Sequence, residues 1–182
     1  MLTKIKSAWI IVTLTLMKTW DNIHRFLFGI PTLKRSQITA NLFLGSQYNK
    51  VGLKMLKKIG VTAIVNMRIH SVYGKARYTG FKYLHLPTVD NTPPSIEVLW
   101  EGASFIETEI NNGGKAYIHC RQGLGRGPTM TLAYLIKIGT TFADAMALVK
   151  GVRPFVNPRP EQIERLKEFE IYCRNIKPEQ TS

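Results

Sequence analysis

The chain has 182 residues, 45% of them hydrophobic, and a formal net charge of +13 at pH 7. This length predicts one domain with a sizeable core, and two cysteines exclude a disulfide-stapled scaffold. The positive charge favours anionic partners such as phosphorylated substrates, an acidic membrane surface or nucleic acid. No aromatic-basic RNA-binding motif accompanies the charge, so we do not expect a nucleic-acid partner.

Residues 1–33 differ from the rest and predict a helical extension. Apolar side chains recur there at steps of three and four: Ile5, Trp9, Val12, Leu16, Trp20, Ile23 and Leu27. The uncharged run 8–17 is too short for a bilayer span, which needs about 20 residues. We expect one of two arrangements. Either the helix docks on the rest of the chain, or residues 1–28 lie on an acidic membrane surface. A signal or anchor sequence is a third interpretation, although no small-residue cleavage site follows.

Residues 34–177 alternate between strand and helix patterns, and 178–182 form a short tail. Short apolar runs at 42–44, 61–66, 81–86 and 116–119 predict strands. Helices are predicted from Ser46 or Gln47 to Gly60, after the caps Ser95 and Thr141, and at the chain end after a proline-rich break. The pattern indicates an α/β fold with a short, mostly parallel central sheet and helices on both faces.

One stretch, 116–129, joins a strand to a helix through a glycine-rich loop. Cys120 leaves the strand, Arg126 stands where the helix begins, and Pro128 suits an early helical position. Loop amides and a helix N-terminus together form an anion site. Gly123 and Gly125 are expected to allow a positive φ and a close approach to the anion.

The chemistry of this loop points to phosphoryl transfer. The guanidinium of Arg126 can bind two phosphate oxygens, and the same positive field stabilises the thiolate of Cys120. A thiolate directed at a bound phosphorus is a nucleophile. Such a thiolate needs a reducing compartment, so we expect a cytoplasmic protein, with peripheral membrane attachment as the alternative.

His119, Cys120, Gly123 and Arg126 match the HCxxGxxR signature. The chain from about Ser36 onwards resembles the dual-specificity branch of the cysteine-based protein tyrosine phosphatases. The resemblance implies a phosphocysteine at Cys120 and a loop in which His119 supports the structure and helps to keep the cysteine ionised. It also implies phosphate binding by Arg121, Gln122, Gly123, Leu124, Gly125 and Arg126.

Gly127 departs from the family pattern, which has Ser or Thr directly after the arginine. In the family that hydroxyl helps the cysteine leave in the second step. Gly-Pro-Thr resembles prokaryotic members, and Thr129 is a candidate for an alternative hydroxyl. The missing hydroxyl is expected to affect hydrolysis of the phosphocysteine rather than binding of phosphate.

Asp90 lies in the loop 87–94 and is the candidate general acid. A carboxylic acid beside the pocket can protonate the leaving oxygen, which contributes about 10²–10⁴ in rate. The family has an aspartate in this position, and Asp90 stands in a matching Leu-Pro-Thr-Val-Asp context. Arg153, in an Arg-Pro pair that also resembles the family, is expected to brace the active-site loop.

These observations predict a monomeric phosphomonoesterase, and they imply no metal or organic cofactor. The resemblance implies that its substrates are phosphotyrosine, phosphoserine and phosphothreonine proteins. Two alternatives remain open. One is a lipid-phosphate phosphatase at a membrane surface, with a phosphoinositide or a phosphatidylglycerophosphate-like substrate. The other is a slow-turnover phosphate-binding module.

Overall fold

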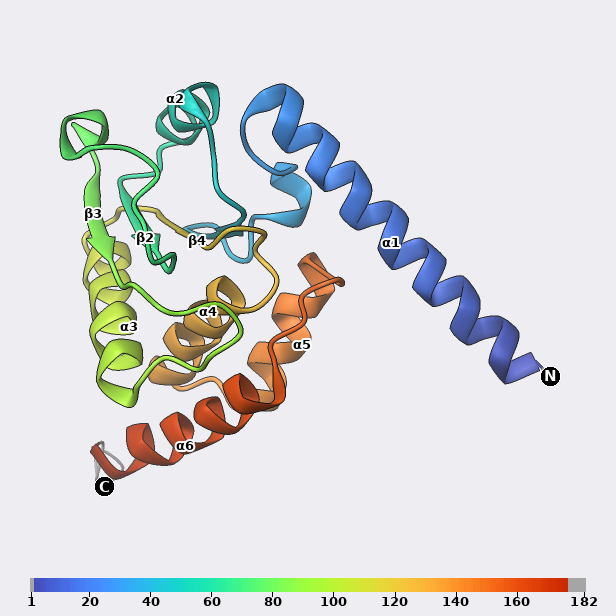
Figure 1. Cartoon of the computed structure of the whole chain (residues 1–182). Coiled ribbons are helices and arrows are strands. Elements are labelled where there is room, and N and C mark those ends of the chain that lie inside the picture. Colours follow the sequence, from blue (N-terminus) through green and yellow to red (C-terminus); the bar gives the residue numbers. More distant parts are fainter. Residues whose placement is uncertain (1, 177–182) are drawn as a thin grey trace.

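The computed structural model describes residues 2–176, so residue 177 and the predicted tail 178–182 lie outside the described part. Within it, all strands belong to one parallel sheet with the order β1-β4-β2-β3 (Figure 1). The strands are β1 (Leu42–Gly45), β2 (Ala63–Asn66), β3 (Lys82–His85) and β4 (Ala116–His119). The α/β fold predicted from the sequence is confirmed, and every strand pairing is parallel.

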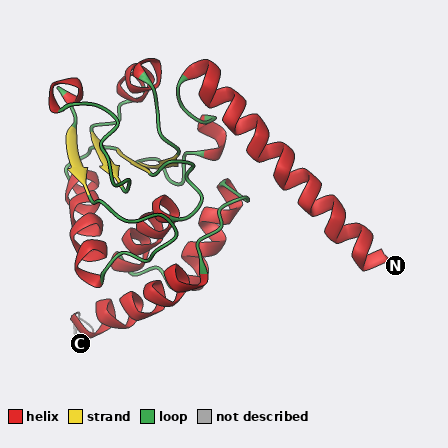
Figure 2. Ribbon diagram, viewed as in Figure 1, coloured by secondary structure: helices red, strands yellow, loops and turns green. Residues whose placement is uncertain are grey.

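Side chains alternate between the two faces of the sheet, so the apolar strands direct apolar side chains to both faces. Helices cover each face. Phe43, Ile64 and Tyr117 pack with α2 (Lys50–Lys58) on one face. On the other face α4 (Arg126–Lys137) lies against β4 and contacts α3 (Ile96–Asn111), α5 (Phe142–Val152) and α6 (Pro160–Ile176) (Figure 2). Two short 3₁₀ turns, Leu33–Arg35 and Lys75–Tyr78, lie in the connections.

Helix starts follow their capping residues. Ser95 Oγ accepts a hydrogen bond from Val98 N at 3.3 Å, and Thr141 Oγ1 accepts one from Asp144 N at 3.2 Å, so both predicted caps are confirmed. The predicted start of α2 at Ser46 or Gln47 was wrong. Asn49 caps this helix instead, since its side-chain oxygen accepts from the amides of Val51 and Gly52.

The first helix, α1 (Leu2–Phe28), extends away from the remaining chain (Figure 1). The apolar stripe faces solvent: Trp9, Val12, Leu16, Trp20, Ile23 and Leu27 are all 44–69% exposed. The helix does contact the rest of the chain, but through a face other than this stripe. The face that packs carries Asp21, which is 4% exposed and pairs with Arg153. In the described part of the chain, no helix has the length and apolar character needed to cross a membrane.

Candidate active site

The predicted phosphate-binding loop lies at the carboxyl end of the central strand, where open parallel sheets bind ligands. Cys120 follows β4 directly and Arg126 is the first residue of α4. Gly123 has φ +69°, and a Cβ there would lie 2.5 Å from the carbonyl oxygen of Gly45, so this turn requires glycine. Gly125 has φ −117°, which corrects the expectation of a positive φ at that position.

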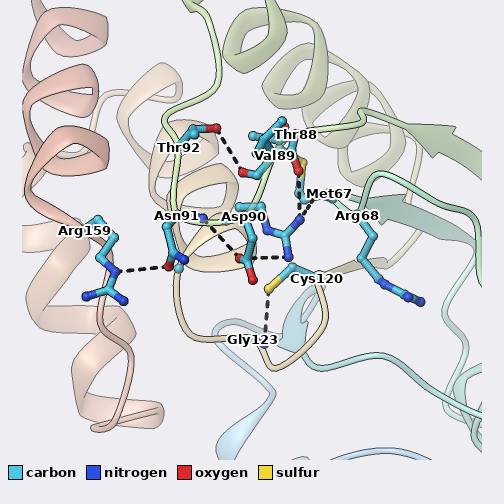
Figure 3. Close-up of polar contacts among 12 residues, drawn as sticks. Met67, Arg68, Thr88, Val89, Asp90, Asn91, Thr92, Cys120, Gly123 and Arg159 are labelled. Carbon is cyan, nitrogen blue, oxygen red and sulfur yellow. Dashed lines mark hydrogen bonds and ion pairs between the residues drawn. The ribbon is translucent and has the colours of Figure 1, made fainter.

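Cys120 is buried and lines a cavity of about 350 Å³. Its Sγ accepts a hydrogen bond from the amide of Gly123 at 3.2 Å (Figure 3). The sulfur therefore points into the loop, at the side where the amides converge. Gly125, the N-cap of α4, has no side chain that could cap the first-turn amides, which leaves them available to an anion.

The guanidinium of Arg126 is buried and held by three neighbours. Nη1 donates to the carbonyl of Thr88 at 2.8 Å and to that of Met67 at 3.4 Å, while Nη2 lies 2.9 Å from Asp90 Oδ1. Nε is buried, and no atom among residues 2–176 accepts a hydrogen bond from it. A buried donor without an acceptor is costly, so this N–H is suited to a ligand oxygen.

Asp90 stands at the tip of its loop, and its side chain is 65% exposed. The next residue, Asn91, has φ +63°, a left-handed conformation that asparagine tolerates. Asn91 Oδ1 accepts from Arg159 Nε at 3.1 Å (Figure 3). Thr92 O accepts from Gln162 Nε2 at 2.9 Å. The start of α6 thus fixes the loop that carries the candidate acid.

Arg153 braces the phosphate-binding loop from behind, which confirms its predicted structural role. Its Nε donates to the carbonyl of Gly123 at 3.1 Å and its Nη2 donates to that of Gln122 at 3.3 Å. Its Nη1 lies 2.8 Å from Asp21 Oδ2 in an ion pair that is almost fully buried. The loop backbone is therefore connected to α1 through one guanidinium.

His119 and Thr129 lie under the loop and do not line the cavity. Burial lowers the pKa of His119 to about 3, so the imidazole is neutral near pH 7 and supplies no positive charge to Cys120. Its Nδ1 lies 3.3 Å from the carbonyl oxygen of Cys120, so its expected part in keeping the cysteine ionised would come from a neutral ring and stays a prediction. The Thr129 hydroxyl donates to the carbonyl of Gly125 at 3.0 Å, so its only proton is used in the first turn of α4.

The cavity brings most of the predicted site residues together. Those that line it are Asp90, Cys120, Arg121, Gln122, Leu124, Gly125 and Arg126. The sequence did not identify five further lining residues: Lys18, Asn91, Asn157, Arg159 and Gln162. Among residues 2–176, no group of three or more His, Cys, Asp or Glu side chains could hold a metal ion.

Known proteins resemble this chain in sequence. The family model "Dual specificity phosphatase, catalytic domain" matches residues 42–172. Dual specificity protein phosphatase 1B of Arabidopsis thaliana is 31% identical over 82% of this chain and 88% of its own length. Dual specificity protein phosphatase 1-A of Xenopus laevis is 31% identical over 74% of this chain. The chain spans only 36% of that relative's length.

Solved structures agree with the fold. The active form of Tk-PTP has a TM-score of 0.71 at 29% identity, covering 77% of this chain and 99% of the other. PTPMT1 in complex with PI(5)P has a TM-score of 0.72 at 26% identity, covering 78% and 97%. Together with the family model over residues 42–172, these similarities assign the chain to the dual-specificity phosphatase family.

Proposed function

We propose that the protein hydrolyses phosphomonoesters through a phosphocysteine. Cys120 Sγ attacks phosphorus, the P–O bond to the leaving group breaks, and Asp90 gives its proton to the leaving oxygen. Asp90 then takes a proton from a water molecule that attacks the phosphocysteine. The S–P bond breaks, and inorganic phosphate and the thiolate are released.

The observation that carries this proposal is the hydrogen bonding of the Arg126 guanidinium. Its guanidinium is fixed by the carbonyls of Thr88 and Met67, while its Nε keeps an unused proton. A phosphoryl oxygen is a suitable acceptor for that donor, and other oxygens would bind the loop amides of residues 121–126. In this proposal His119 and Thr129 support the loop from below.

Proteins that carry phosphotyrosine, phosphoserine or phosphothreonine are the first substrate class. The support is the family itself, since the curated relatives are named dual specificity protein phosphatases. A lipid phosphate at a membrane surface is the second candidate. PTPMT1, a structural neighbour, was solved with PI(5)P, and α1 of this chain exposes large apolar side chains such as Trp9 and Leu16.

With a lipid substrate, the protein would be a cytoplasmic monomer that attaches peripherally to the membrane through residues 1–28. The exposed Trp9 and Trp20 suit a bilayer interface, and the net charge of +13 favours an acidic one. We expect the full chain to sediment with vesicles that contain phosphatidylglycerol and to be released by salt. Trp9→Gln should weaken this binding, whereas equal binding to purely zwitterionic vesicles would contradict the electrostatic part.

Hydrolysis of p-nitrophenyl phosphate tests the chemistry itself. The full chain should turn over this aryl phosphate, and Cys120→Ser should abolish turnover. Cys173→Ser, a matched substitution in α6, should retain it. Activity that survives in Cys120→Ser would disprove the nucleophile. A burst equal to the enzyme concentration, followed by a stall, would instead identify a slow-turnover phosphate-binding module.

A further inference from the structure

Helix α1 borders the active-site cavity through Lys18, although α1 lies outside residues 42–172 that match the family model. Lys18 is half-buried and lines the same cavity as Cys120 and Arg126. The extension therefore contributes a cation to the wall of the site.

The position of Lys18 is fixed by its neighbour one turn later. Residues three apart lie on the same helix face, so Lys18 and Asp21 point to the same side of α1. Asp21 Oδ1 accepts from the amide and the hydroxyl of Thr32, and Oδ2 pairs with Arg153. Since Arg153 also binds the loop carbonyls of Gly123 and Gln122, Lys18 is held at a defined place beside the loop.

A second cavity, of about 320 Å³, is lined in part by Leu14, Thr15 and Lys18 of α1. Both cavities are lined by Lys18 and Asn157, which makes them neighbours that share one wall. The other lining residues of the second cavity are mostly apolar: Leu14, Thr15, Lys150, Pro154, Phe155 and Val156. A largely apolar cavity with Lys18 in its wall therefore lies next to the phosphate site.

The charges around the first cavity exceed what one phosphate requires. Arg126 and the loop amides suffice for a single phosphoryl group, yet Lys18, Arg121 and Arg159 line the same cavity. Asp90 is the one carboxylate among the lining residues, and it pairs with Arg126. The three remaining cations are complementary to a second anionic group on the substrate.

We propose that the site takes a lipid phosphomonoester whose headgroup carries a second anionic group. Lys18 binds that second anion, and the lipid chain leaves through the apolar cavity between α1 and the segment 154–157. This inference rests on the proposed phosphatase chemistry and selects the second of its two substrate classes. The exposed apolar residues of α1 would then lie in the membrane that supplies the substrate.

The test compares three probes with the full chain. Phosphatidylinositol monophosphate in phosphatidylcholine vesicles carries a phosphomonoester, a phosphodiester and chains. Phosphatidic acid in the same vesicles lacks the second anion, and glycerophosphoinositol monophosphate lacks the chains. We expect phosphatidylinositol monophosphate to have the highest kcat/KM, at least about tenfold above the deacylated compound.

Lys18→Gln should reduce the ratio of kcat/KM for phosphatidylinositol monophosphate to that for phosphatidic acid by about tenfold, because one charge-assisted hydrogen bond is lost. Lys34→Gln is the matched control: it removes the same charge from an exposed lysine that lines neither cavity, and should leave the ratio unchanged.

Three results would overturn the inference. These are an unchanged ratio in Lys18→Gln, equal rates with and without chains, or a phosphotyrosine peptide hydrolysed faster than both lipids. Failure to hydrolyse p-nitrophenyl phosphate would instead reject the underlying phosphatase chemistry, so the two failures are distinguishable.

Discussion

Asp90 Oδ1 lies 2.9 Å from Arg126 Nη2, so the candidate acid is bound to the guanidinium proposed to hold phosphate. The two residues come from different elements, the loop after β3 and the start of α4. A phosphoryl oxygen that binds Arg126 would compete with the carboxylate for Nη2. The loop tip is nevertheless kept over the cavity, because Asn91 and Thr92 are hydrogen-bonded to residues at the start of α6.

Asp90→Asn removes the proton donor while preserving side-chain size. We expect kcat for substrates with alkyl leaving groups to fall by about 10²–10⁴, since protonation of the alkoxide is lost. The effect should be much smaller for p-nitrophenyl phosphate, because its leaving group departs readily as an anion. Steady-state kinetics over a series of leaving groups measures this. An equal loss for all leaving groups would indicate that Asp90 acts only through Arg126.

Gly127→Ser should accelerate hydrolysis of the phosphocysteine. A Cβ at this position would lie 3.6 Å from Cys120 Sγ, so a serine hydroxyl could reach the sulfur and stabilise the departing thiolate. One such hydrogen bond contributes about 1 kcal/mol, or roughly fivefold in rate. Leu44 Cδ1, at 3.2 Å from that Cβ, must shift slightly.

Gly127→Ala is the matched control for this change, since it adds the same Cβ without a hydroxyl. Rapid-mixing measurements of the burst and of the following steady state separate formation of the phosphocysteine from its hydrolysis. The serine variant should raise only the second rate and the alanine variant should raise neither. A gain in the alanine variant would attribute the effect to packing.

Much of the central architecture could be predicted because its signals are local. Strands are short apolar runs, and caps such as Ser95 and Thr141 accept from the amide three residues ahead. The start of α2 was predicted wrongly because Ser46 and Asn49 are equally good N-caps by residue type. Burial of Tyr48 in the core favours the later residue, Asn49. The phosphate-binding loop could be identified because its chemistry requires a cysteine and an arginine at the spacing of Cys120 and Arg126.

The parts that could not be predicted depend on contacts between distant segments. Periodicity shows that α1 has an apolar stripe, but it does not show which face packs. Arg153 is buried and needs a counter-charge, so the face with Asp21 packs and the stripe remains exposed. The same docking brings Lys18 to the cavity, across more than a hundred residues of chain from Cys120.

Asp21→Asn tests the link between α1 and the phosphate-binding loop. The amide can still accept hydrogen bonds from Thr32, but it leaves the buried guanidinium of Arg153 without a counter-charge. Removing one partner of a buried ion pair costs about 3–5 kcal/mol in the free energy of unfolding. Urea denaturation measures this loss, and inorganic phosphate should bind the variant more weakly.

Glu168→Gln provides the control for that experiment. It breaks the ion pair between Glu168 and Arg165 on the surface of α6, which should cost about 0–1 kcal/mol. If both variants lose the same small amount of stability, the buried pair between α1 and Arg153 does not hold the helix in place.

The lowered pKa of His119 predicts that the folded protein loses stability in mild acid. Burial lowers its pKa in the folded protein to about 3, below the ordinary value of 6.5, and the nearby Arg68 and His85 act in the same direction. The stabilising contribution is complete above pH 6.5 and declines as pH falls, because only the unfolded chain takes up the proton. Between pH 8 and pH 5 the free energy of unfolding should fall by about 2 kcal/mol from this group.

Urea denaturation at several pH values checks this dependence. His119→Gln should be less stable at pH 8, yet it should lose about 2 kcal/mol less on going to pH 5. His70→Gln, at an exposed position, is the matched control and should keep the slope of the parent protein. If both variants keep that slope, His119 is protonated in the folded state already near pH 6, and its ring cannot be the neutral support beneath Cys120.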